Sequence, residues 1–223
     1  MNSSCNNIYL EIIVKFIYFS ILRQEIKMFQ VNDGASIILA SESTRRVDIL
    51  RTLGISFSII PPKIDEQREK DEPPKDFVLR ISHEKAIKVG NHFPSNWVIG
   101  ADTIVVLKGK ILGKPKGEKD AYNMLKALRG KWHKVFTGYC VLNISKNIAY
   151  RDVVETKVFV RDLTDEEIMR YIKTSEPLDK AGSYALQGKG GYMVKEIKGS
   201  YANVVGLPIC EVTEALLSLG VLS

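Results

Sequence analysis

Cysteine is scarce in this sequence, and its spacing excludes two classes of stabilising site. Only Cys5, Cys140 and Cys210 are present among 223 residues, and no two of them form a CxxC pair. Neither a disulfide framework nor a zinc site is therefore expected. The same pattern favours a reducing, intracellular compartment, and we predict a cytoplasmic protein. Cys140 and Cys210 lie in apolar runs, so both are predicted to be buried.

The sequence also lacks an uninterrupted apolar run long enough to span a membrane. Residues 8–22 are very apolar, but Glu11 and Lys15 interrupt them, whereas a spanning helix needs about 18–20 apolar residues in a row. The basic start and small-residue cleavage site of a secretory signal are not clear either. Three alternatives stay open: an extra packed helix, a weak targeting or membrane-contacting segment, or residues upstream of a true start at Met28. The first and third are favoured over targeting, and no stable membrane insertion is expected.

Motifs of nucleic-acid-binding domains are missing as well. There is no RNA-recognition motif, helix-turn-helix or stripe of alternating basic and aromatic residues, so a nucleic-acid partner is not expected. The net charge of +6 is compatible with nucleic acid, acidic lipid or phosphorylated small molecules, and its sign alone does not choose among them. The positions are more informative, because several basic residues follow directly after apolar, strand-like runs.

Helix-like and strand-like segments alternate along the chain, which predicts an α/β fold with a mixed sheet. The apolar content of 45% allows a substantial core. We expect strands at residues 36–40, 55–60, 97–101 and 192–197, and hairpins formed by 104–112 and by 134–145 with 148–161. We expect helices beginning near residue 47 and over 77–89, 118–128, 164–172 and 207–219.

The first candidate site is the polar segment from Ser41 to Arg46, which lies between a strand and a helix. Backbone N–H groups at a helix N-terminus attract anions, and arginine binds phosphate oxygens in a bidentate way. The alternative is an ordinary helix cap followed by a solvated basic turn. The segment is not a Walker loop, because it lacks the glycines and lysine of GxxxxGKS/T.

Acidic residues provide the second candidate. Asp102 follows the strand at 97–101, and a carboxylate at the carboxyl end of a buried strand faces the crevice where α/β sheets bind ligands. It could hold Mg²⁺ or activate water, although a cap or turn aspartate is the commoner role. Asp65 and Glu66 also suit a hard cation, with a solvated charged loop as the alternative.

Two lysines and a glycine-rich segment complete the candidates. Lys85 lies on the apolar stripe of a predicted helix, an unusual place for a charge unless it reaches a partner, and Lys114 precedes Pro115 in a rigid turn. Either lysine could instead be a surface side chain. Residues 179–188 contain Gln187, whose amide suits a base edge, unless the loop has no ligand. His133 is interpreted as structural.

Together these residues and their neighbours resemble the Maf family. The resemblance extends from Ile37 to Leu219 and divides the chain into an N-terminal extension, residues 1–35, and a Maf-like domain, residues 36–223. Thr44 and Glu42 depart from the family pattern, in which proline and a small residue are usual. The matching stretches are LASESTRR, IDE, the lysine of HEKA, GADTIVV, GKP, FTG, ETKVFV, DKAGSYALQG and GSYANVVGLP.

The resemblance implies a fold similar to that of the inosine triphosphatase superfamily: an elongated, twisted mixed β-sheet with flanking helices and a cleft between two lobes. It also implies that a homodimer hydrolyses nucleoside triphosphates to the monophosphate and pyrophosphate, with Mg²⁺ or another divalent cation such as Mn²⁺. The role would be house-cleaning. The alternative is a nucleotide-binding regulator of cell division with little turnover.

Residue roles are carried over from the same resemblance. Asp102 matches the proton acceptor, and Glu66 with Asp102 would hold the metal. The combination of GADT with ALQG resembles the subgroup that acts on dTTP and UTP. The phosphate-binding positions match Ser41, Arg45, Arg46, Lys85 and Lys114, and the specificity positions match Arg45, Thr103 and Gln187.

Overall fold

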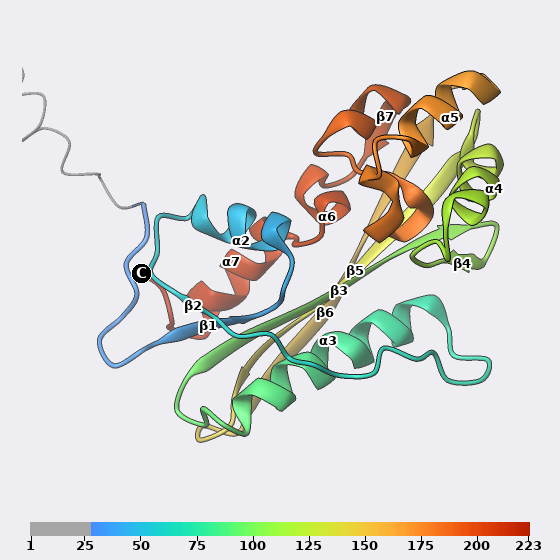
Figure 1. Ribbon diagram of the computed structural model, residues 1–223. Coiled ribbons are helices and arrows are strands. Elements are labelled where there is room, and N and C mark those ends of the chain that lie inside the picture. Colours follow the sequence, from blue (N-terminus) through green and yellow to red (C-terminus); the bar gives the residue numbers. More distant parts are fainter. Residues whose placement is uncertain (1–27) are drawn as a thin grey trace, which may run out of the picture.

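The structure is a computed structural model that describes residues 28–223. The expectations for residues 8–22 and for Cys5 lie outside the described residues. Residues 28–35, assigned above to the extension, lie beside the C-terminal end of the chain: Val31 pairs with Leu222, and the Gln30 N–H donates to the Ser223 carbonyl at 2.9 Å. Figure 1 shows this contact where the blue start of the chain passes the C-terminus.

One mixed β-sheet, seven-stranded within residues 28–223, forms the centre of the molecule (Figure 1). Its order is β2-β1-β3-β5-β6-β7, and β4 pairs with β3 on the edge that β1 also uses. β1 runs parallel to β2 and β3, and the other pairs are antiparallel. The strands are β1 (Ile37–Ala40), β2 (Ser58–Ile59), β3 (Trp97–Leu107), β4 (Lys110–Leu112), β5 (Trp132–Asn143), β6 (Ile148–Val160) and β7 (Val194–Lys198).

Helices cover both faces of this sheet. In Figure 1, α3 lies along one face, α2 and α7 lie at the β1 end, and α4 and α5 lie at the far end. The α/β class and the mixed sheet predicted from the sequence are confirmed. The helices are α2 (Thr44–Arg51), α3 (Pro74–Gly90), α4 (Glu118–Leu128), α5 (Asp165–Ile172), α6 (Tyr201–Val205) and α7 (Ile209–Ser218), with short 3₁₀ turns η1 (Glu176–Asp179), η2 (Ala181–Ser183) and η3 (Lys189–Met193).

Two separate apolar clusters on the face opposite α3 give the molecule its two lobes. Because side chains alternate along a strand, odd-numbered residues of β3 and β5 share this face. Ile99 and Tyr139 belong to the cluster under α2 and α7, whereas Val105 and Val135 belong to the cluster under α4 and α5. The paired Thr103 and Thr137 lie between the clusters, so a polar floor separates the lobes.

The largest error in the predicted elements concerns β3. The sequence predicts a strand ending at residue 101 with Asp102 after it, but β3 continues through Asp102 to Leu107. Asp102 and Thr103 pair with Gly138 and Thr137 of β5, and these backbone pairings let a polar pair stay inside the strand. Asp102 still reaches open space, because β1 pairs with β3 only as far as Gly100 and β4 begins pairing only at Val105.

Smaller differences separate the predicted elements from the observed ones. The strand predicted at 55–60 covers only Ser58–Ile59, and the last strand is Val194–Lys198. Helix α6 was not predicted. Cys140 is buried as expected, but Cys210 is exposed, because α7 directs Val212 and Leu216 into the core and leaves Cys210 on its outer side. No helix within residues 28–223 has the length and apolar character needed to cross a membrane.

Candidate functional site

A cavity of about 800 Å³ opens where β3 lacks a neighbour between the end of β1 and the start of β4. Its walls come from the loop after β1 on one side and from residues 179–187 on the other, which is the cleft between two lobes expected from the sequence. All nine predicted site residues line it: Ser41, Arg45, Arg46, Glu66, Lys85, Asp102, Thr103, Lys114 and Gln187.

The centre of the cavity is an ion-paired trio. The ammonium of Lys85 lies 2.7 Å from Asp102 Oδ1 and 2.7 Å from Glu66 Oε1. Lys85 and Asp102 are buried, with side chains 6% and 8% exposed, so their charges are weakly screened. The unusual position of Lys85 on an apolar helical stripe is thereby explained, because the lysine reaches two carboxylates.

Two glycines allow α3 to approach the sheet closely enough for this contact. A Cβ on Gly100 of β3 would lie 2.2 Å from the Ser82 carbonyl oxygen, and one on Gly138 of β5 would lie 2.3 Å from the Val78 carbonyl oxygen. Only glycine fits at such distances. Gly100 lies two residues before Asp102, and Gly138 is the residue that pairs with Asp102 on β5, so the sequence motifs GAD and FTG place Lys85 against Asp102.

Electrostatics favour an ionised Glu66. Burial opposes the charge of its carboxyl group, but Lys85, Lys114 and Arg46 outweigh burial and lower the pKa below its ordinary value. Glu66 therefore stays anionic at neutral pH. Lys114 is itself exposed at the cavity mouth, where its charge is available to a ligand.

The loop after β1 supplies hydroxyl and guanidinium donors. Ser41 is 3% exposed, and its Oγ accepts from the Ser43 N–H at 3.1 Å. Arg46, in the first turn of α2, donates from Nε to the Gly206 carbonyl at 2.7 Å and from Nη2 to Thr103 Oγ1 at 3.1 Å. Burial lowers the pKa of Arg46, and the charges of Asp102 and Glu66 oppose this shift, so the guanidinium remains a cation beside the trio.

Thr103 lies on the cavity floor with its hydrogen-bonding groups already engaged. Its hydroxyl lies 2.9 Å from Thr137 Oγ1 and accepts from Arg46. Thr137 in turn donates to the Asn203 carbonyl at 2.9 Å. This chain of contacts ties the predicted specificity residue to the segment 203–206.

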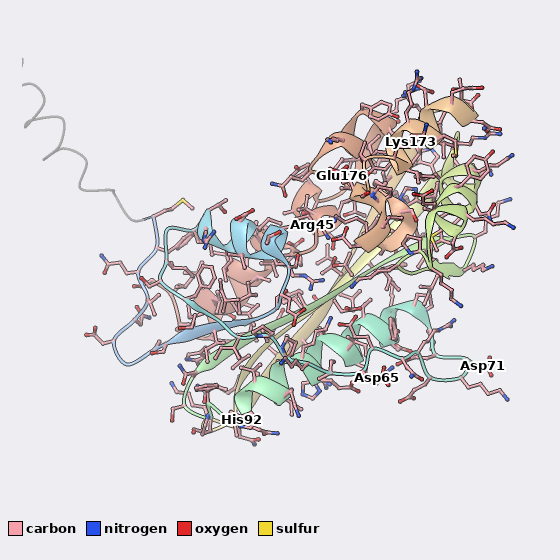
Figure 2. All side chains as sticks on the ribbon, in the orientation of Figure 1. Arg45, Asp65, Asp71, His92, Lys173 and Glu176 are labelled. Carbon is pink, nitrogen blue, oxygen red and sulfur yellow. The ribbon has the colours of Figure 1, made fainter. Side chains whose placement is uncertain are left out.

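The predicted specificity residues Arg45 and Gln187 come from opposite walls. Arg45 is half-buried at the beginning of α2 and faces the segment that carries Glu176, as Figure 2 shows. Burial lowers the pKa of Arg45, with Asp179 and Glu176 acting against that shift. Gln187 is exposed on the loop after η2. Asp65, paired with Glu66 in the sequence, does not line the cavity.

In a comparison with known protein families, residues 36–219 match the Maf family, which is described as "Maf-like protein". The chain belongs to the Maf family. It is 47% identical over 186 residues to a protein of Geotalea uraniireducens (strain Rf4) named dTTP/UTP pyrophosphatase, covering 83% of this chain and 96% of that protein. It is 44% identical over 187 residues to a protein of the same name from Syntrophus aciditrophicus (strain SB), covering 84% and 91%.

Solved structures also match this Maf-family chain. An example is the structure of a HAM1 protein from Coxiella burnetii. The match covers 82% of this chain and 99% of the HAM1 chain, with 12% sequence identity and a TM-score of 0.42.

The acidic residues of the Maf chain fit a Mg²⁺ ion that is shared with a phosphate ligand. Mg²⁺ in nucleotide sites binds one or two carboxylates and completes its octahedron with phosphate oxygens and water. Glu66 and Asp102 converge on one ammonium group, so a cation is accommodated between them. No group of three or more metal-binding side chains occurs within residues 28–223, and such a set is not needed when phosphate supplies ligands.

Some residues of this Maf cavity had no role assigned from the sequence. Asp179 and Lys180 line the wall opposite Arg45, and the Gly206 carbonyl orients Arg46. All three lie in the stretches DKAGSYALQG and GSYANVVGLP, so the motifs located them but not their contacts. His133 is buried and lies 2.8 Å from the Tyr184 hydroxyl. That contact agrees with the structural interpretation, since Tyr184 forms part of the cavity wall.

Proposed function

We propose that this chain hydrolyses nucleoside triphosphates between the α and β phosphates, releasing the monophosphate and pyrophosphate. dTTP and UTP are the proposed substrates, with modified pyrimidine nucleotides as further candidates, and the role is house-cleaning. The observation that carries the proposal is the ion-paired trio of Glu66 with the buried Lys85 and Asp102, inside a cavity that also gathers Arg45, Arg46 and Lys114. The names of the relatives agree with it.

The charge of the substrate explains this composition. A triphosphate carries about four negative charges, which attack at the α phosphorus requires to be neutralised. Arg45 and Arg46 approach from α2, Lys114 from the cavity mouth and Lys85 from α3. Such cations stabilise a transition state because they are already in place before charge develops. Bound Mg²⁺, held by Glu66 and Asp102, would supply Lewis acidity at the phosphate oxygens.

Asp102 is the proposed proton acceptor. Its Oδ1 is engaged by Lys85 at 2.7 Å, so Oδ2 is the atom that accepts the proton of the attacking water. Lys85 contributes by fixing the carboxylate, because a general base must lie within hydrogen-bonding reach of its proton in a defined orientation. The Ser41 hydroxyl and the first-turn N–H groups of α2 complete the set that binds phosphate.

We further propose that Gln187 reads the base. Uracil and thymine present a carbonyl next to an N3–H group, and a glutamine amide can donate to the one and accept from the other. Gln187 lies on the wall opposite the loop after β1, and this position supports base binding by Gln187 and phosphate binding by that loop. A homodimer and a cytoplasmic location are also proposed, the latter supported by the free thiols of Cys140 and Cys210.

The function is tested with the purified full chain, Mg²⁺ and a panel of UTP, dTTP, CTP, ATP and GTP, with pyrophosphate release as the readout. We expect UTP and dTTP to have the highest kcat/KM values, and chelation of Mg²⁺ to abolish turnover. Tight nucleotide binding without turnover would instead favour the division regulator, and release of inorganic phosphate would contradict the proposed bond cleavage.

A further inference from the structure

The loop that carries Gln187 is held from outside the cavity by one carboxylate. Glu176, at the beginning of η1, accepts from the Lys189 N–H on Oε1 at 3.0 Å and from the Gly190 N–H on Oε2 at 2.9 Å. These two donors follow Gln187 by two and three residues. Both carboxylate oxygens are therefore committed to the backbone immediately after the proposed base-reading residue.

A hydroxyl holds the other end of the same loop. Tyr171 of α5 accepts from the Ala185 N–H at 3.1 Å, two residues before Gln187, and its hydroxyl helps to lower the pKa of the Glu176 carboxyl group. Tyr171 is buried, with 3% exposure. The segment 186–188 is consequently fixed at both ends, by Tyr171 on one side and by Glu176 on the other.

The glycines of the loop are required by this contact. A Cβ on Gly188, where φ is +141°, would lie 2.3 Å from Glu176 Oε1, and a Cβ on Gly190 would lie 2.6 Å from the Tyr171 hydroxyl. The loop thus approaches the carboxylate and the hydroxyl as closely as backbone can. The glycines on either side of Lys189 are explained by this packing against Glu176 and Tyr171.

Charge supports the same arrangement. Burial disfavours ionisation of Glu176, but the N–H groups of Lys189 and Gly190 and the Tyr171 hydroxyl outweigh burial and lower the pKa of the carboxyl group. The charge of the ionised carboxylate also acts on Arg45, where it opposes the lowering of the guanidinium pKa by burial. Hydrogen bonds to an ionised acceptor are about twice as strong as neutral ones, so the loop is firmly held.

We propose that Glu176 is a positioning residue for substrate selection, which holds the loop so that the Gln187 amide faces the base. This inference rests on the proposed function, because it assumes that Gln187 reads the base. Glu176 does not touch the substrate. Its effect passes through the backbone of residues 185–190 and should therefore alter the choice between bases more than the chemical step.

The test compares kcat/KM for UTP and for CTP in wild type and in Glu176→Gln. The two substrates share the same triphosphate, so the effect that a change in the charge near Arg45 has on phosphate binding cancels in their ratio. An amide keeps the size of the side chain but replaces one acceptor with a donor that faces a backbone N–H. We expect the UTP:CTP ratio to fall about tenfold, as for one lost buried hydrogen bond, with kcat for UTP changed less than about threefold.

Hydrogen exchange of the 185–190 amides gives a second readout that needs no substrate. We expect faster exchange in Glu176→Gln, and unchanged exchange overturns the proposal whatever the kinetics show. If Gln187→Glu lowers the ratio but Glu176→Gln does not, the positioning role fails while base reading stands. If Gln187→Glu leaves the ratio unchanged, base reading itself fails, and exchange alone then decides whether Glu176 holds the loop.

Three further variants make the result specific. In the Gln187→Glu background, Glu176→Gln should lower the ratio no further, whereas an independent effect of Glu176 would add and contradict the proposal. Tyr171→Phe removes only the hydroxyl and should shift the ratio in the same direction, which keeps the test decisive if Glu176→Gln does not fold. Glu196→Gln, an exposed glutamate of β7 beside Lys198, is the matched control and should behave as wild type.

Discussion

Replacement of Asp102 by asparagine separates chemistry from folding. The change keeps the size of a side chain that is 8% exposed and lies in the middle of β3. The amide oxygen can still accept from Lys85, and Lys85 keeps its contact with Glu66 at 2.7 Å. The fold should therefore lose only about 1–3 kcal/mol, the cost of weakening one buried hydrogen bond, out of a typical 5–15 kcal/mol.

The effect on turnover should be far larger. An amide cannot accept the proton of water, and general-base catalysis contributes about 10²- to 10⁴-fold. It is also a weaker Mg²⁺ ligand than a carboxylate, which places the expected loss of kcat/KM for UTP toward the upper end of that range. Pyrophosphate release measures the rate, and thermal unfolding measures the fold.

A control of the same chemistry guards against unspecific effects. Asp48→Asn changes an exposed aspartate of α2, 54% exposed and 3.4 Å from Arg51, and should leave kcat/KM within about twofold, since surface changes have little effect. If Asp102→Asn kept activity within about threefold of wild type with an unchanged unfolding midpoint, Asp102 would not be the base and the reasoning would be refuted.

Three further predictions concern other parts of the molecule. A chain beginning at Met28 should keep kcat/KM, because Val31 and the residues beside it still pair with the C-terminus. Gln187→Glu should erode the UTP preference over CTP, about 5- to 150-fold for a mismatch of roughly 1–3 kcal/mol, because a carboxylate cannot donate to a base carbonyl. Burial lowers the pKa of His133 from 6.5 to about 4. The free energy of unfolding of wild type should therefore fall by up to about 3 kcal/mol as pH falls from 6.5 toward 4. The His133→Gln variant should lose less stability over the same range.

Each of these has a direct measurement. An insoluble or inactive chain from Met28 would place the preceding residues in the core or in an interface. An unchanged UTP:CTP ratio for Gln187→Glu would remove it from base reading, whatever the absolute rates. Urea unfolding at several pH values tests His133: the unfolded chain binds the extra proton, so stability must rise with pH in this window, and equal slopes for wild type and variant would contradict the assignment.

The sequence predicted which residues meet but not how they meet. Apolar periodicity located β1, α3 and the hairpin of β5 and β6, and the motifs gathered all nine site residues in one cavity. The sequence pattern misplaced Asp102 at a strand end, because two successive polar residues, Asp102 and Thr103, in an apolar run resemble a strand boundary. Their pairing with Gly138 and Thr137 is a long-range contact, which local patterns do not encode.

The same limit explains the other errors. Cys210 lies in an apolar run, and a run that short does not reveal which face of α7 becomes buried. The carboxylate of Glu176 accepts from the Gly190 N–H 14 residues away, and the Gly206 carbonyl accepts from the Arg46 side chain 160 residues away. Contacts of that kind depend on the folded chain, so sequence motifs indicated the segments but not the hydrogen bonds.

Oxygen-isotope labelling of the products tests the central claim most directly. The full chain is incubated with UTP and Mg²⁺ in H₂¹⁸O, and the products are examined by mass spectrometry. Attack of water at the α phosphorus predicts UMP and pyrophosphate, with one ¹⁸O atom in UMP and none in pyrophosphate. Appearance of the label in pyrophosphate, formation of UDP and inorganic phosphate, or absence of turnover would contradict the account.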